Sequence, residues 1–227
     1  MVVRLHPQAR RGERPKRGVP AETRARIVAA AASEFRTGGY FGTDSNVIAR
    51  AAGYAPGTFY KHFADKRAAF MAVYTEWIRA QWKDFEAIAR RQLPQAETAA
   101  RFVDLLLVNH REWRVFRASL TALVATDPVV RRHHRDCRKR QVKRMTELLG
   151  GSKSAREALG LLVIEHIADA VVDGETDAIG VPEAVAREHL VTALMRMPKP
   201  RRTTAATAKP PTKRSALRVT RAPRRRA

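Results

Sequence analysis

Five residues between positions 57 and 62 are the best suited in this sequence to recognise another molecule. Helical spacing predicts that Gly57, Thr58, Lys61 and His62 face outward together, with Tyr60 at their edge. Hydroxyl, ammonium and imidazole groups hydrogen-bond phosphates and base edges, and lysine suits guanine whereas a threonine methyl suits thymine. The sequence contains no GxSxG, HExxH, GxGxxG or phosphate-loop pattern. These residue types therefore indicate recognition of nucleic acid rather than catalysis.

Two short helices around a glycine turn are predicted to present these side chains. Thr43 or Asp44 can cap the first helix, since each offers a side-chain oxygen to free backbone N–H groups. Gly53 can end that helix with a positive φ, which glycine adopts without strain. The apolar face of this helix consists of Val47, Ile48, Ala51 and Ala52.

The second helix is predicted to begin near Pro56, because the N–H that proline lacks is not needed in a first helical turn. Phe59 and Phe63, four residues apart, should pack on the first helix and leave the polar side chains outside. A helix, a glycine turn and a helix with a small polar outer face form a helix-turn-helix. The second helix of such a motif fits the major groove of DNA.

The stretch as a whole follows the pattern IAxxAGxxxGTxYxHFxxK, and RARIVAAAASEFRTGGYFGTD precedes it. In both parts it resembles the tetracycline-repressor (TetR) family of bacterial transcription regulators, over residues 22–70. Tyr54-Ala55 stands where that family often has Val-Ser, so the second helix lacks a serine cap, and Arg67-Ala68-Ala69 replaces the usual Glu-x-Leu. The matching residues are Ile48, Ala49, Ala52, Gly53, Gly57, Thr58, Tyr60, His62, Phe63 and Lys66.

The resemblance implies a set of DNA contacts on and beside the second helix. For each of these residues the alternative is an exposed polar helix face without a partner. Gly57 would let the helix approach the DNA closely. Backbone phosphates would be held by Thr43, Ser45, Tyr60 and Lys66. Base edges or the flanking backbone would be reached by Asn46, Thr58, Lys61 and His62.

The rest of the chain keeps helical spacing and shows neither strand alternation nor an internal repeat. We predict an all-α fold of about nine helices, with an N-terminal three-helix helix-turn-helix DNA-binding domain and a C-terminal helical ligand-binding and dimerisation domain. Outside the motif, helices are expected over 21–37, 65–92, 95–110, 111–125, 128–149, 153–173 and 182–196. The expected divisions are a disordered basic arm (1–19), the DNA-binding domain (20–66), the ligand-binding and dimerisation domain (67–197) and a disordered tail rich in Lys, Arg, Pro and Ala (198–227).

Most of the positive charge lies in the two predicted tails. The chain has a net charge of +22, of which residues 1–19 carry +5 and residues 198–227 carry +11. Tails of this composition cannot bury a core, and they favour polyanions such as nucleic acid. They leave an alternative function open, that of a non-specific DNA-compacting or nucleoid-associated protein. The other interpretation is that the tails are solvated and bind no partner.

The resemblance also implies a small-molecule effector held between the helices of the second domain. An aromatic-rich apolar face with a few polar groups would suit a lipophilic ligand. Packed core is the alternative for each candidate residue. The candidates are Phe102, Asn109, Trp113, Phe116, His134, Cys137, Gln141 and His166.

Two copies of the chain are expected to form a homodimer, because one helix-turn-helix contacts too few base pairs to select an operator. By resemblance, the eighth and ninth predicted helices (153–173 and 182–196) would pair with their copies in a four-helix bundle. Ordinary packing within one chain is the alternative for their apolar faces. The expected function is therefore a repressor that an effector releases from a palindromic operator in double-stranded DNA.

Neither a metal nor another cofactor is expected. His134 and Cys137 are three residues apart on one helical face, which is a workable ligand pair, but the surrounding RRHHRDCRKR is dense in positive charge. The single cysteine excludes an internal disulfide, and no run approaches the roughly 18 apolar residues of a membrane span. A cytoplasmic, nucleoid-associated location without membrane contact is the corresponding expectation.

Overall fold

The computed structural model describes residues 19–149 and 155–196, and within these ranges it contains ten helices and no strand. The predicted all-α fold is thus confirmed. The helices are α1 (Pro20–Thr37), α2 (Ser45–Ala51), α3 (Pro56–His62), α4 (Lys66–Ala89), α5 (Gln95–Glu112), α6 (Arg114–Thr126), α7 (Pro128–Leu149), α8 (Ala155–Asp173), α9 (Glu175–Ala178) and α10 (Glu183–Met195). The basic arm predicted over 1–19, apart from its last residue, and the tail predicted over 198–227 lie outside the described residues.

The segment between α8 and α10 differs from the prediction, which made it a loop. Gly174 has a φ of 79° and separates α8 from the short helix α9. Four residues are too few to show a hydrophobic period, so sequence patterning could not reveal this helix. The described part therefore has ten helices rather than about nine.

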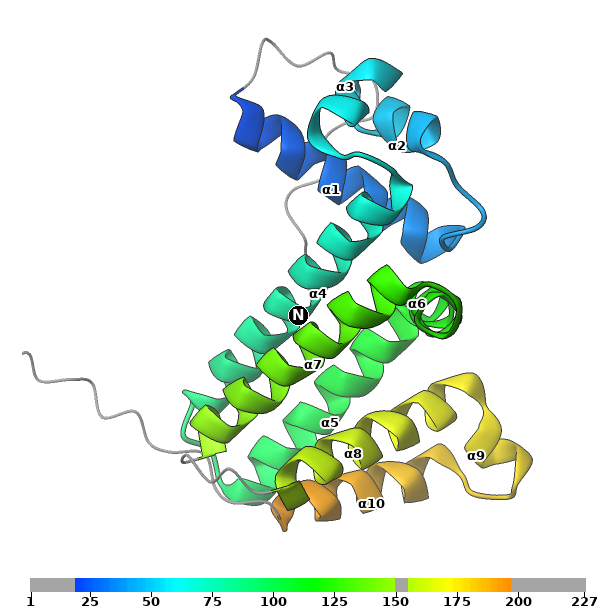
Figure 1. Cartoon of the computed structure of the whole chain (residues 1–227). Helices are drawn as coiled ribbons and strands as arrows, with labels where there is room; N and C mark the ends of the chain where they lie inside the picture. Colours follow the sequence, from blue (N-terminus) through cyan, green and yellow to red (C-terminus); the bar gives the residue numbers. More distant parts are fainter. Residues whose placement is uncertain (1–18, 150–154, 197–227) are drawn as a thin grey trace, which may run out of the picture.

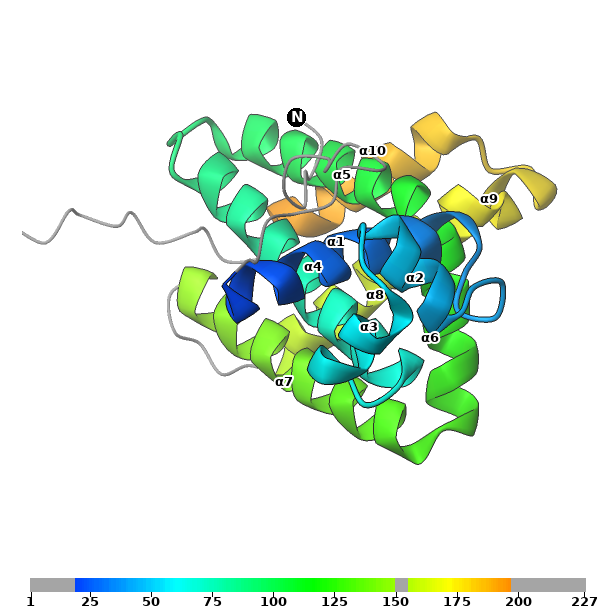
Figure 2. The same cartoon turned by 90° about the horizontal axis from the view of Figure 1, so that it is seen from above.

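The helices α1–α3 form one end of the molecule and α8–α10 form the other (Figure 1). Between them, α4 starts beside the first group and packs against α1, α5 and α7. In the view from above, α1–α3 lie in front of α4 and α8 (Figure 2). None of the described helices is both long and apolar enough to cross a lipid bilayer.

Fully buried aromatic rings join the helix-turn-helix to the central helices. Phe70 of α4 lies 5.1 Å from Phe35 of α1 and 4.4 Å from Phe116 of α6, measured between ring centroids. These rings belong to one apolar cluster that extends from α1–α3 into α4, α6 and α7. A second cluster, which includes Val103 and Leu190, joins α5, α8 and α10. Because interiors are close-packed, a displacement of α6 must be felt around α1 and α4.

Candidate functional site

The local signals of the helix-turn-helix act as the sequence predicts. The Asp44 carboxylate caps α2 by accepting hydrogen bonds from the backbone N–H groups of Asn46 (2.7 Å) and Val47 (2.9 Å). These backbone hydrogen bonds from Val47 and Asn46 lower the pKa of Asp44. Gly53 takes a φ of 81° in the turn, and Pro56 is the first residue of α3. The turn thereby sets the direction in which α3 leaves α2.

The outer face of α3 gathers most of the predicted DNA contacts. Phe59 on the inner face is fully buried, whereas the Tyr60 side chain beside it is 56% exposed. A methyl group added at Gly57 would meet no atom within 4 Å, so this position is open to an approaching groove. Of the other predicted contacts around α3, Asn46 and Lys61 are exposed, and Ser45, Thr58 and His62 are half-buried.

Two of the predicted phosphate contacts, Thr43 and Lys66, face the interior rather than the outer face of α3. Thr43 is 8% exposed, and its hydroxyl is buried with no hydrogen-bond partner among the described residues. The Lys66 ammonium donates hydrogen bonds to the backbone carbonyls of Tyr40 and Thr43, both at 2.7 Å, and lies 4.3 Å from the Tyr40 ring centroid. Burial lowers the pKa of Lys66 despite the nearby charge of Asp44. Lys66 thus ties the loop before α2 to the start of α4.

Two further contacts attach the loop after α1 and the first turn of α4 to α6 and to the residue that follows it. The backbone N–H of Tyr40 donates to Ser119 Oγ at 2.9 Å. Gly39 beside it has a φ of 67°, and a β-carbon there would come within 2.8 Å of Ser119 Oγ. Arg67 donates to Asp127 at 3.1 Å, which connects the first turn of α4 to the start of α7.

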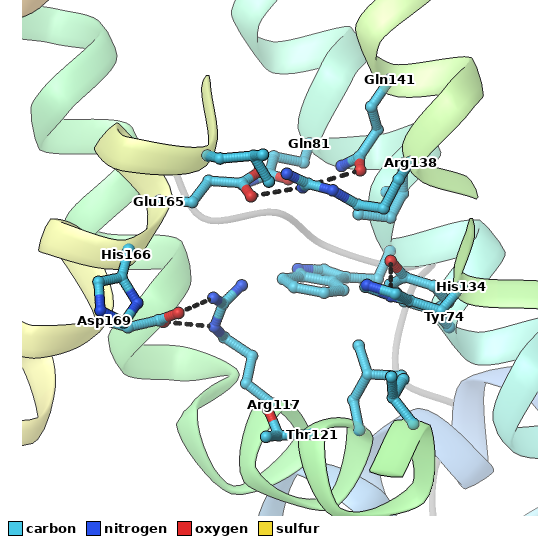
Figure 3. Close-up of a pocket in the computed structure, with 15 residues that line it drawn as sticks. Tyr74, Gln81, Arg117, Thr121, His134, Arg138, Gln141, Glu165, His166 and Asp169 are labelled. Carbon is cyan, nitrogen blue, oxygen red and sulfur yellow. Dashed lines mark hydrogen bonds and ion pairs between the residues drawn. The ribbon is translucent and has the colours of Figure 1, made fainter. Parts of the chain in front are cut away.

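A cavity of about 320 Å³ lies between α4, α6, α7 and α8 (Figure 3). Its volume is at the lower end of the range for small-molecule sites, about 300–1,000 Å³. Three of the predicted ligand-binding residues line it, namely His134, Gln141 and His166.

The other five predicted ligand-binding residues do not line this cavity but pack elsewhere. Asn109 is buried and donates to the Leu105 carbonyl, and Cys137 lies beside His133. The three aromatic members pack on other rings: Phe102 on Phe85, Trp113 on Trp77 and Phe116 on Phe70.

Charged groups that the sequence analysis missed occupy the cavity wall. Arg117 of α6 donates through Nε and Nη2 to the two carboxylate oxygens of Asp169 on α8, with the Nε contact at 2.7 Å. Arg138 of α7 pairs with Glu165, one turn earlier on α8 (Figure 3). Burial alone would raise the pKa of Asp169, but hydrogen bonds from His110 and Arg117 hold that pKa at about 2. The available signal was Glu165 and Asp169, two acids four residues apart within the largely apolar middle of α8.

Tyr74 of α4 and His134 of α7 meet on the same wall, with 3.0 Å between the phenol oxygen and Nδ1. Burial raises the pKa of Tyr74, so the phenol keeps its proton at neutral pH. Burial, followed by the positive charges of Arg138 and Arg117, lowers the pKa of His134. The imidazole is therefore neutral at neutral pH and can accept the hydrogen bond of the phenol.

The metal-ligand pair suggested by the sequence does not form, because His134 turns toward Tyr74. It is His133 that lies near Cys137, with 3.5 Å between Nε2 and Sγ. In residues 19–149 and 155–196, no three His, Cys, Asp or Glu side chains converge as metal ligands would.

The end of the molecule formed by α8 and α10 exposes large apolar side chains. Each of four is at least half exposed in the single chain, so intrachain packing does not account for them. They are Leu159, Leu162, Val163 and Val185. Leu159, Leu162 and Val163 are three and four residues apart and so share one face of α8, and a group of exposed apolar side chains is typical of a contact surface for another molecule.

The helix α3 with its polar outer face, the capped helix α2 before it and the helical body with a cavity define a helix-turn-helix DNA-binding protein. Residues 27–73 match the family model described as bacterial regulatory proteins, tetR family. This match covers the helix-turn-helix, and the fold of the described residues is the one that solved TetR-family transcriptional regulators have. No curated protein matches the chain.

Solved structures share the fold at low sequence identity. A transcriptional regulator from Rhodococcus sp. Rha1 is 19% identical, covers 76% of this chain and 91% of its own, and has a TM-score of 0.56. The fatty acid degradation regulator FadR from Bacillus halodurans is 18% identical, covers 82% of this chain and 100% of its own, and has a TM-score of 0.56. A regulator from Saccharomonospora viridis, solved in complex with choline, is 18% identical, covers 77% of this chain and 94% of its own, and has a TM-score of 0.57.

Proposed function

We propose that this chain is a homodimeric repressor that binds a palindromic operator through α3 and leaves it when a small ligand enters the cavity. The observation that carries the proposal is the outer face of α3, which exposes Tyr60 and Lys61 above a fully buried Phe59. The Tyr60 hydroxyl suits a phosphate, and Lys61 and Thr58 suit base edges in the major groove. Thr43 and Lys66 support this surface from inside.

The apolar face of α8 and α10 supports the dimer in this proposal. Leu159, Val163 and Val185 are exposed at the end of the molecule opposite α3. Pairing two copies there would leave both recognition helices free to contact DNA. Two such helices reach successive major grooves when they lie about 34–36 Å apart.

Helix α6 is the element that would connect the ligand to the DNA. Arg117 and Thr121 of this helix line the cavity, while Ser119 accepts the hydrogen bond from the Tyr40 backbone. A ligand that displaces α6 therefore acts on the loop that precedes α2. The ligand can shift the equilibrium only by its difference in affinity between the DNA-competent and DNA-incompetent forms.

One solved structure with this fold, that of the Saccharomonospora viridis regulator, contains the small molecule choline. The sequence favoured a lipophilic effector for this chain. The cavity, however, is lined by Arg117, Arg138, Glu165 and Asp169 together with the apolar Trp77. An uncharged apolar ligand would desolvate these groups without replacing their hydrogen bonds to water. A polar effector suits the lining better.

Selection of bound genomic fragments, followed by footprinting, tests the proposal. The full-length protein should protect a palindrome, and Tyr60→Ala together with Thr58→Ala should abolish that protection. Lys83→Ala is the matched control, because Lys83 is an exposed basic residue of α4 outside the predicted DNA contacts. Uniform protection of all fragments, or full retention of the footprint by the double variant, would refute the proposal.

The distribution of charge favours a second candidate function, non-specific DNA compaction. Residues 198–227 alone carry +11, and a polycation binds DNA of any sequence by releasing counterions. Deletion of residues 198–227 should then weaken binding to random DNA and flatten its dependence on salt. An unchanged salt slope would remove this function from consideration.

A further inference from the structure

We infer that the cavity binds a small organic carboxylate with an apolar body, which Arg117 and Arg138 hold through their remaining N–H groups. The inference rests on the proposed function, in which this cavity is the effector site. It adds the chemical class of the effector and the two side chains that select it.

Each arginine has one edge of its guanidinium without a hydrogen-bond partner among the described residues. A guanidinium offers five N–H donors. Arg117 uses Nε and one N–H of Nη2 for Asp169, and no hydrogen bond in the described part engages its Nη1. Arg138 uses Nη1 for Glu165 and for Gln141 (3.1 Å), which leaves the edge formed by Nε and Nη2. Two parallel N–H groups on such an edge match the two oxygens of a carboxylate.

The two guanidiniums converge on one region of the cavity. Their partners Glu165 and Asp169 are four residues apart on α8, so these carboxylates lie on one face about one helical turn apart. Arg117 reaches Asp169 from α6 and Arg138 reaches Glu165 from α7, as Figure 3 shows. Both arginines line the cavity together with His134, and after burial their positive charges lower the pKa of that imidazole.

The surplus of donors favours an anion over a cation. The Asp169 carboxylate already accepts two bonds from Arg117 and lies 2.8 Å from His110 Nδ1. A cation would have to compete with Arg117 and Arg138 for the two carboxylates. An entering carboxylate would instead accept hydrogen bonds from the unused N–H groups of the two arginines. It would leave the ion pairs of these arginines with Asp169 and Glu165 in place.

Apolar side chains beside the arginines would receive the rest of the ligand. Trp77, Leu120 and Val124 line the same cavity. The Arg117 guanidinium carbon lies 5.8 Å from the centre of the Trp77 ring, so the charged and apolar parts of the site are adjacent. A compact acid fits a cavity of about 320 Å³ at this junction.

The test is a titration of the full-length protein with three acids: phenylacetate, 3-phenylpropionate and octanoate. The primary amide of each acid and 2-phenylethylamine serve as uncharged and cationic counterparts. Calorimetry should show at least one acid binding about 10- to 100-fold more tightly than its amide, since charge-assisted bonds to arginine are lost in the amide. The amine should bind no better than the amides.

A pair of double variants assigns the preference to the cavity. Arg138→Gln with Glu165→Gln removes one pair without leaving a buried unpaired charge, and it should lower the preference for the acid over its amide, because only Arg117 then remains to hold the carboxylate. Arg144→Gln with Glu86→Gln removes a matched pair (2.7 Å) whose members do not line the cavity, and it should leave the preference intact. Thermal unfolding of both variants checks that they fold.

Three results would overturn the inference: no acid binding more tightly than its amide, a preference for the amine, or an unchanged preference in Arg138→Gln with Glu165→Gln. None of them concerns DNA. The footprint without ligand, and its loss in Tyr60→Ala with Thr58→Ala, is measured separately. A failure of the carboxylate site is thus distinguishable from a failure of the proposed repressor function.

Discussion

Replacement of Lys66 by methionine separates a structural role of this residue from a phosphate contact. Methionine keeps an unbranched stem and removes the ammonium. In the structure that ammonium donates to the carbonyls of Tyr40 and Thr43 at 2.7 Å and lies over the Tyr40 ring at 4.3 Å. The variant therefore loses two charge-assisted hydrogen bonds and one cation–π contact.

The expected loss of stability follows from these contacts. A hydrogen bond to a charged group contributes about 1.5–3 kcal/mol, and a half-buried site belongs near the lower end of that range. Desolvation of the ammonium, which the substitution relieves, offsets part of the total. We expect a decrease of about 2 kcal/mol in the free energy of unfolding, and hence of about 4–8 °C in Tm for a chain of this size.

Thermal and denaturant unfolding of Lys66→Met would be compared with Lys61→Met, in which an exposed lysine of α3 is changed. Lys61→Met should unfold within about 0.5 kcal/mol of the parent and bind DNA more weakly. If Lys66 served only to hold a phosphate, Lys66→Met would keep its stability and lower the salt slope of DNA binding by about 1. A Tm equal to that of the parent would refute the structural role.

Four other substitutions test separate parts of the molecule. Gly57→Ala should leave Tm unchanged or higher, since no atom lies within 4 Å of the new methyl, but fluorescence anisotropy should show weaker binding to the operator. Ser119→Ala removes the acceptor of the Tyr40 N–H and should cost about 1 kcal/mol in denaturant unfolding. The pKa of Asp169 is about 2 instead of the ordinary 3.8, so its stabilising effect is complete above about pH 4 and is lost as the pH falls toward 2; acid unfolding of Asp169→Asn should lack this part of the profile. Leu159→Glu places a charge on the exposed apolar face of α8; sedimentation should show dimers for the parent, as proposed, and monomers for the variant. An unchanged sedimentation coefficient would place the dimer contact elsewhere.

The sequence by itself determined the all-α class and the helix-turn-helix, because their signals are local. Asp44, Gly53 and Pro56 act on the backbone within a few residues of themselves, and they cap, end and begin helices as predicted. The period of apolar residues likewise assigned Phe59 and Phe63 to the buried side of α3. A contact between neighbours in the chain does not depend on how distant helices pack.

Only the tertiary structure decided which side chains share a site. Periodicity shows that a helix has an apolar face, but it does not show which helix that face meets. The sequence therefore led to the prediction that Lys66 holds a DNA phosphate, and it could not show that the ammonium also meets carbonyls more than twenty residues earlier in the chain. The arginine pairs of the cavity bring α6 and α7 to α8, and a side chain's partner across such a distance is set by the packing of whole helices.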